Sequence, residues 1–140
     1  MKDDCFIDTN IFVYSFDLDE PEKRKKAKKI IKNTLSNDRG YISIQVIQEF
    51  YNVATKKFKL PMHILAAKEY LEKVFMQLNV VYPSYDFIST GLDIYTTTRY
   101  SFYDSLIISA ALKSSCSVLL TEDMQHGQKI QNLRIENPFL

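Results

Sequence analysis

The stretch Asp4-Cys5-Phe6-Ile7-Asp8-Thr9-Asn10 decides the fold class and supplies the first candidate site residue. A short apolar run, Cys5-Phe6-Ile7, ends abruptly in a carboxylate and two small polar residues. An apolar run bounded by turn-forming residues is typical of a buried strand. In an open α/β sheet, ligands bind outside the carboxyl ends of the strands. Asp8 therefore stands where a functional acid is expected, and the question is which other acids converge on it.

Further along the chain, apolar runs that predict strands alternate with stretches of helical periodicity. Strands are expected at 41–44, 79–82, 117–120 and, as a last edge strand, 133–135. Helices are expected at 11–16 (with Thr9 or Asn10 as its N-cap), 21–35, 45–58, from Pro61 to about 78, 84–95 (with Ile88, Gly91, Leu92 and Tyr95 on one side) and 103–113. Because the predicted strands are continuous apolar runs separated by helices, they favour a parallel sheet covered on both faces.

Composition narrows the class of protein. The 140 residues are 46% hydrophobic and 25% charged, so we expect one globular domain spanning 1–140. A net charge of +1 argues neither for nor against a nucleic-acid partner. No apolar run approaches the ~18 residues that cross a bilayer, so no membrane association is expected. Cys5 and Cys116 lack CxxC spacing and are expected as reduced thiols in a cytoplasmic protein, and the two histidines make a zinc site unexpected.

Two predicted strands end in the same way. Asp8 follows Phe6-Ile7, and Asp123 follows Leu119-Leu120-Thr121-Glu122. If these strands are neighbours, the two carboxylates meet at one edge of the sheet. The alternative is that each aspartate only caps the next helix or forms an Asx turn.

Two more acids are candidates, and each has a structural alternative. Asp104 lies in Ser101-Phe102-Tyr103-Asp104, which matches a capping box at the start of the predicted buried helix. The helix dipole would also keep a carboxylate there ionised, as a metal ligand must be. Glu49 falls opposite the apolar stripe of its helix, as expected of a solvated face, although it has no Lys or Arg three or four residues away to pair with.

Basic residues gather on the polar face of the predicted helix 21–35. This face could track the phosphates of a nucleic acid, or it could be ordinary solvated surface. The candidates for nucleic-acid contacts are Lys25, Lys28, Lys29 and, elsewhere in the chain, Arg99.

Taken together, these segments resemble the PIN domain family, metal-dependent nucleases that include the VapC-type toxins. The first motif is Phe6-Ile7-Asp8-Thr9-Asn10, and Glu49 falls where the family has its acidic residue after the second strand. The most specific match is Tyr100 to Ala111, which is similar to the third motif. Leu120-Thr121-Glu122-Asp123 resembles the fourth motif, and Asn137-Pro138-Phe139 also fits.

The resemblance implies a three-layer α/β/α fold with a central parallel sheet of four to five strands, the first and fourth of them neighbours. It also implies that Asp8, Glu49, Asp104 and Asp123 form one catalytic and metal-binding cluster, with Glu122 as an outer participant. Thr9, Asn10 and Ser101 would orient the substrate or a metal-bound water. Carboxylates without histidine or cysteine suit Mg²⁺ or Mn²⁺.

The implied activity is endoribonuclease hydrolysis of RNA that leaves a 5′-phosphate and a 3′-hydroxyl. VapC-type toxins are partnered by a small antitoxin and usually form homodimers, so both partners are expected here. The alternatives within the family are an RNA-processing nuclease without an antitoxin and a PIN-like module that binds RNA or a partner without cleaving.

Two other classes fit less well. A phosphoacceptor receiver domain needs an aspartate at the end of its third strand, where this chain has Val80-Val81-Tyr82-Pro83. A phosphatase of the haloacid-dehalogenase type needs Asp-x-Asp, where this chain has Asp8-Thr9-Asn10.

Overall fold

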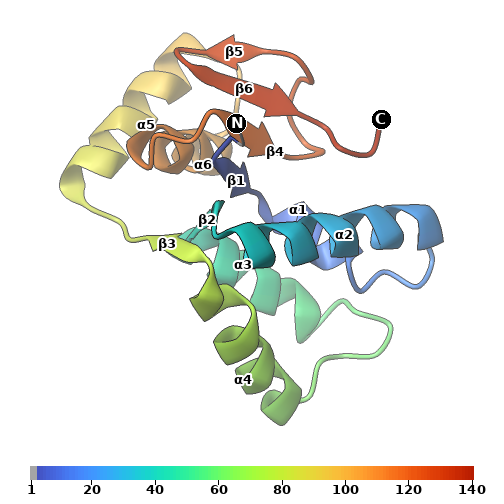
Figure 1. The fold of residues 1–140 in the computed structure, drawn as a ribbon. Helices are drawn as coiled ribbons and strands as arrows, with labels where there is room; N and C mark the ends of the chain where they lie inside the picture. Colours follow the sequence, from blue (N-terminus) through green and yellow to red (C-terminus); the bar gives the residue numbers. More distant parts are fainter. Residues whose placement is uncertain (1–2) are drawn as a thin grey trace.

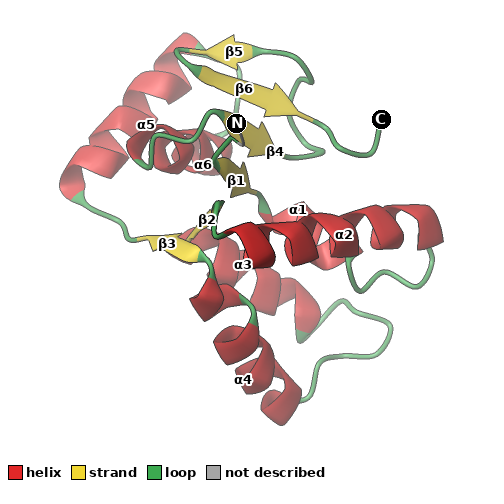
Figure 2. Ribbon diagram, in the orientation of Figure 1, coloured by secondary structure: helices red, strands yellow, loops and turns green. Residues whose placement is uncertain are grey.

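The computed structural model describes residues 3–140 and contains a six-stranded sheet in the order β3-β2-β1-β4-β6-β5 (Figure 1; Figure 2). Five strands are parallel to their neighbours, which confirms the predicted parallel sheet, and β5 adds a short antiparallel edge. Strand β6, which was predicted as an edge strand, pairs with β4 on one side and β5 on the other, so that prediction was wrong. The strands are β1 Cys5–Ile7, β2 Gly40–Ser43, β3 Asn79–Val81, β4 Val118–Leu120, β5 Lys129–Ile130 and β6 Leu133–Glu136.

Helices flank the sheet, and the chain has the predicted mixed α/β architecture with three layers, α/β/α (Figure 1). Helices α5 and α6 pack against each other, and α1 packs against both α2 and α3. The helices are α1 Thr9–Tyr14, α2 Pro21–Asn37, α3 Ile44–Ala54, α4 Ile64–Lys73, α5 Tyr85–Thr97 and α6 Phe102–Lys113, with a 3₁₀ turn, η1, at Phe75–Gln77. None of the described helices combines the length and the apolar character needed to cross a membrane.

Local sequence signals set most helix starts. The hydroxyls of Ser43, Ser84 and Ser101 accept hydrogen bonds from backbone amides at the starts of α3, α5 and α6. Pro21 begins α2, as expected of proline at a first helical position. The predicted N-cap of the first helix was wrong: Asp8 caps α1, and Thr9 is already helical.

The predicted lengths of the third and fourth helices were wrong. The Ala54 carbonyl accepts a hydrogen bond from the Met62 amide at 2.9 Å, so the chain folds back where α3 ends and does not continue to residue 58. His63 caps α4, which ends at Lys73 before η1. Ile64, the first residue of α4, is exposed.

Helix α5 turns a different face to the core than its apolar pattern predicts. Phe87, Gly91 and Ile94 are buried, whereas Ile88 and Leu92 lie largely in solvent. The side chains of α6 come so close that a Cβ at Gly91 would lie 2.6 Å from the Leu106 Cδ2. Gly91 therefore faces α6, at a position where a larger side chain would clash with Leu106.

Helix α6 is buried on almost every side, as its sequence predicts. Every residue from 105 to 111 is buried. The polar members of this run are satisfied within the protein, because Ser109 Oγ donates to the Phe87 carbonyl at 2.7 Å and Ser105 Oγ to the Ser101 carbonyl at 2.8 Å. A buried α6 brings its first turn, with Asp104, close to the carboxyl end of the sheet.

Candidate active site

The pairing of β1 with β4 brings the first two site residues together. Ile7 lies opposite Leu120 in the parallel register, and the Asp8 amide extends the ladder by donating to the Leu120 carbonyl at 3.0 Å. Asp8 and Thr121 therefore leave the sheet side by side. Thr121 Oγ1 donates to Asp8 Oδ2 at 2.8 Å, and the Thr9 amide donates to Asp8 Oδ1 at 2.7 Å. Both carboxylate oxygens of Asp8 thus have a fixed hydrogen-bond partner.

Asp8 is a buried acid whose charge is costly. Burial raises the pKa of Asp8 from its ordinary value of 3.8 to about 7. The hydrogen bonds from Thr9 and Thr121 favour the charged form and oppose this rise, while the negative charges of Glu49 and Asp123 add to it. A cation bound beside Asp8 would offset both the cost of burying its charge and the repulsion from Glu49 and Asp123.

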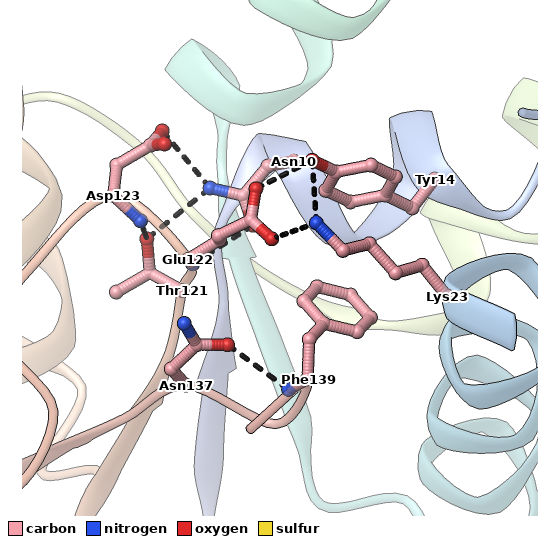
Figure 3. A network of polar contacts seen from close by, with 8 residues as sticks. All are labelled: Asn10, Tyr14, Lys23, Thr121, Glu122, Asp123, Asn137 and Phe139. Atoms are coloured by element: carbon pink, nitrogen blue, oxygen red, sulfur yellow. Dashed lines mark hydrogen bonds and ion pairs between the residues drawn. The ribbon is translucent and has the colours of Figure 1, made fainter. Parts of the chain in front are cut away.

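Asn10 ties the segment after β4 to α1, as Figure 3 shows. Its amide nitrogen Nδ2 donates to Asp123 Oδ2 at 3.0 Å and to Thr121 Oγ1 at 3.2 Å. Its carbonyl oxygen Oδ1 accepts from the Glu122 amide at 3.3 Å. The Asp123 amide in turn donates to Thr121 Oγ1 at 3.1 Å. One asparagine therefore holds three consecutive residues in place.

Glu49 lies toward Asp8 rather than on an open solvated face. Glu49 Oε1 accepts from the Thr9 hydroxyl at 2.7 Å, and Gln45 Nε2 lies 3.4 Å from Glu49 Oε2. Since Thr9 directly follows Asp8, this bond places the α3 carboxylate next to the end of β1.

Asp104 lies in the first turn of α6, half-buried. Its amide donates to the Ser101 hydroxyl at 3.1 Å, which is the N-cap bond that the capping pattern predicts. Burial raises the pKa of Asp104, and the charge of Asp123 raises it further. The negative charge of Asp123 therefore disfavours the charged form of Asp104.

These residues line one open pocket of about 530 Å³ at the carboxyl end of the sheet. Ser101 is absent from its lining and acts as the cap of α6. None of the predicted nucleic-acid contacts lines it: Lys25, Lys29 and Arg99 are exposed elsewhere, and Lys28 borders a separate groove. The lining of the pocket consists of Asp8, Thr9, Asn10, Val13, Tyr14, Asp17, Glu49, Asn52, Val53, Asp104, Glu122 and Asp123.

The donor chemistry of this pocket suits a hard divalent cation. Carboxylate, amide and hydroxyl oxygens line it, and no His or Cys does. Among residues 3–140, no three Asp, Glu, His or Cys side chains stand close enough together to hold a metal ion as they are placed. Carboxylates repel one another when no cation lies between them, and the charges of Glu49 and Asp123 add to the rise in the pKa of Asp8 that burial mainly causes.

Three residues of the site region had not been singled out from the sequence. Thr121 follows β4 just as Asp8 follows β1, and the pairing of these strands was the signal that could have identified it. Tyr14 and Lys23 both donate to the Glu122 carboxylate. These bonds lower the pKa of Glu122 although burial alone would raise it, and the bond to Glu122 raises the pKa of Lys23. Lys23 is one of many lysines on α2, so no sequence pattern distinguishes it.

The sequence matches a known protein family, and the fold matches solved structures. The PIN domain family model matches residues 5–129. A chain of a toxin–antitoxin complex from Klebsiella pneumoniae has the same fold, with a TM-score of 0.70 and 17% identity over 96% of this chain and 97% of that chain. No curated protein matches the chain by sequence.

Two further structures share the fold. A chain of VapBC2 from Rickettsia felis, solved with a DNA fragment from its promoter, has a TM-score of 0.67 and 21% identity over 95% of this chain and 97% of that chain. VapC20 from Mycobacterium tuberculosis, described as a toxin that cleaves the sarcin–ricin loop, has a TM-score of 0.62 and 14% identity over 82% and 86% of the two chains. The family model covers most of the sequence, so this chain belongs to the PIN domain family.

Proposed function

We propose that this PIN domain is an endoribonuclease that uses Mg²⁺ or Mn²⁺ to hydrolyse RNA phosphodiester bonds, and that it is the toxin of a toxin–antitoxin pair. The observation that carries this proposal is one open pocket lined by four acids from four separate segments of the chain: Asp8, Glu49, Asp104 and Asp123. A structural helix cap needs one such acid, whereas four acids lining one open pocket form a set of ligands for a hard cation.

In this proposal each acid has a role that its hydrogen bonds support. Asp8 is the central ligand, held on both oxygens by Thr9 and Thr121. Asp123, held by Asn10, and Asp104 and Glu49 provide further carboxylate oxygens. When bound, a divalent ion would polarise the phosphoryl oxygen and make a bound water more acidic. Glu122 is already bonded by Lys23 and Tyr14, so it stabilises the site rather than serving as a ligand.

RNA as the substrate is supported by the family and by the fold shared with a toxin that cleaves the sarcin–ricin loop. The pocket is open to solvent, and its carboxylates would carry a strong negative potential without a cation. We therefore propose that phosphate groups approach only when the divalent ion is bound, because the ion offsets the charge of the acids.

An antitoxin partner is supported by structural neighbours that were solved as toxin–antitoxin complexes. A groove of about 710 Å³ between α2 and α4 offers a place for it. Its apolar lining includes Ile31, Leu35 and Tyr70, and Lys28 and Lys32 border it. This combination suits an amphipathic helix that carries acidic side chains. We propose that this partner is encoded next to the toxin and acts with it in the cytoplasm.

A homodimer is the second proposed assembly, and the exposed stripe on α5 supports it. Ile88, Leu92 and Tyr95 follow helical spacing and are 42%, 50% and 49% exposed. Tyr103 at the start of α6 shares a small pocket with Ile88, so the stripe continues across the two helices. A contiguous apolar stripe of this kind marks an interaction site, and two antiparallel copies of α5 would cover it symmetrically.

The experiment that tests the proposed activity compares mixed RNAs incubated with the purified protein in Mg²⁺, in Mn²⁺ and in EDTA. We expect cleavage only with a metal ion, and products that carry a 5′-phosphate and a 3′-hydroxyl. Cleavage that persists in EDTA would contradict the metal role. Co-expression with the product of a small adjacent reading frame should abolish cleavage, and a processing nuclease without an antitoxin would remain active.

A further inference from the structure

The Glu122 carboxylate, in the loop after β4, accepts hydrogen bonds on both oxygens from side chains of two helices. Tyr14 of α1 donates its hydroxyl to Oε1 at 2.5 Å, and Lys23 of α2 donates its ammonium to Oε2 at 2.6 Å. Lys23 Nζ also lies 3.3 Å from the Tyr14 hydroxyl, which closes a triangle (Figure 3). The sequence patterns and the proposed chemistry leave this triangle unexplained.

Aromatic rings surround the ammonium of this ion pair. Lys23 Nζ lies 4.7 Å from the ring centroid of Tyr14 and 5.8 Å from that of Phe139. The two rings contact each other edge to face with centroids 5.0 Å apart, and Asn137 Oδ1 accepts the Phe139 amide. An ammonium over aromatic faces gains a cation–π attraction in addition to its ion pair.

Partial shielding distinguishes this pair from the other lysine pairs of the surface. The side chains of Lys23 and Glu122 are 31% and 24% exposed, whereas those of Lys59 and Asp19 are 68% and 66% exposed. Exposed pairs contribute little because water screens them, and a half-shielded pair with aromatic support holds its geometry better. Lys23 is therefore placed to fix Glu122, and Lys59 provides a matched control.

Fixing Glu122 has consequences for the residues on either side of it. Thr121 donates to Asp8, and Asp123 accepts from Asn10. The Glu122 amide itself donates to Asn10 Oδ1. Figure 3 shows the carboxylate of Glu122 directed to Lys23 and that of Asp123 directed to the Asn10 amide. The Lys23 pair thus anchors the middle of a three-residue segment whose first residue bonds Asp8 and whose last residue lines the acidic pocket.

We propose that Lys23 is a positioning residue of this site: through Glu122, it fixes the segment from Thr121 to Asp123 and so the placement of the Asp123 carboxylate relative to Asp8. This deepens the proposed function and rests on it where it treats Asp123 as a ligand of Mg²⁺ or Mn²⁺. Lys23 itself does not line the acidic pocket.

The test measures Mn²⁺ binding to metal-free protein by titration calorimetry. Lys23→Met keeps the apolar stem over the rings and removes the charge, so we expect affinity to fall about tenfold or more, as with other outer partners of metal ligands. Lys23→Arg should restore binding, and Lys59→Met, which breaks the exposed pair with Asp19, should leave it unchanged. If Lys23 acts through Glu122, adding Lys23→Met to Glu122→Gln should cause no further loss.

A second measurement needs no metal. In EDTA, the backbone amides of Glu122 and Asp123 should exchange hydrogen faster in Lys23→Met than in the unchanged chain or in Lys59→Met. A lower melting temperature with unchanged or tighter Mn²⁺ binding would overturn the proposal, as would unchanged exchange. If the unchanged chain binds no Mn²⁺, the proposed metal-dependent function fails, and the exchange measurement still decides whether Lys23 fixes the segment.

Discussion

Asp8 has hydrogen-bond partners from two separate parts of the chain. It caps α1, and the same carboxylate accepts the hydroxyl of Thr121 from the neighbouring strand end. An acid needed only as a cap could lie in solvent, where water stabilises its charge. Asp8 is buried instead, and this burial raises its pKa to about 7. The protein therefore keeps a destabilising charge at a position where a cation would offset it.

This burial predicts how Asp8→Asn changes stability in EDTA. The folded state holds the Asp8 proton up to about pH 7, whereas the unfolded chain releases it near 3.8. The Asp8 contribution to stability is thus fully present below the unfolded pKa and is lost as the pH rises toward 7. At pH 8, the free energy of unfolding of Asp8→Asn should equal that of the unchanged chain or exceed it by up to about 1–3 kcal/mol. At pH 5 the difference between the two proteins should be smaller. Urea unfolding at both pH values measures this difference. If Asp8→Asn is less stable than the unchanged chain at both pH values, Asp8 is structural.

Thr121 is the second residue on which the site depends. Its buried hydroxyl donates to Asp8 and accepts from the Asn10 amide nitrogen and the Asp123 backbone amide. Thr121→Val keeps the shape and leaves these partners unsatisfied, so we expect a loss of about 1–3 kcal/mol of unfolding free energy. The pKa of Asp8 should rise further, because one bond to its charged form is gone. Thr121→Ser is the matched control in the same urea unfolding series, and equal stability of the Val and Ser variants would contradict this role.

Glu49 shows the limit of sequence periodicity at this scale. Its position opposite the apolar stripe of α3 is what a solvated residue would have. The deciding contact is the Thr9 hydroxyl, 40 positions away in the chain. Only the family resemblance, and no local pattern, suggested that Glu49 belongs with Asp8.

At the scale of elements, capping signals were more informative than helix lengths. Ser84, Ser101 and Pro21 predicted starts that the structure has. The ends of α3 and α4 could not be predicted in the same way. At the end of α3, for example, the Ala54 carbonyl accepts a hydrogen bond from the Met62 amide, in a loop that has no periodic pattern.

Helix α5 carries the prediction that belongs to this scale. Its sequence pattern placed Ile88, Gly91, Leu92 and Tyr95 on one side, but of these four only Gly91 is buried. If a second copy covers the stripe, Leu92→Glu should convert a dimer into a monomer in sedimentation velocity without lowering the melting temperature. Leu65→Glu alters an even more exposed leucine, on α4, and should leave the assembly unchanged. A monomeric unchanged chain, or a dimer that tolerates Leu92→Glu, would contradict the proposed interface.

At the scale of the whole molecule, strand order assembles the pocket. The carboxyl ends of β1 and β4 are neighbours, and the helices that follow or flank them bring Glu49 and Asp104 to the same end of the sheet. The alternation of strands and helices was enough to predict the parallel sheet, because unalternating apolar strands must be covered on both faces. It was not enough to predict the triangle of Tyr14, Lys23 and Glu122, since a lysine on a lysine-rich helix carries no local mark of its partner.

The most direct test of the account is the initial rate of RNA cleavage in Mn²⁺ by the unchanged chain, by Asp104→Asn and by Asp93→Asn. Asp93 is an exposed carboxylate on α5 outside the pocket, so its variant controls for the loss of one charge. We expect the unchanged chain and Asp93→Asn to cleave at similar rates. Asp104→Asn should be slower by at least about 100-fold, since a ligand should matter no less than an outer partner. Equal rates for Asp104→Asn and Asp93→Asn would contradict the claim that the acids of this pocket perform the cleavage.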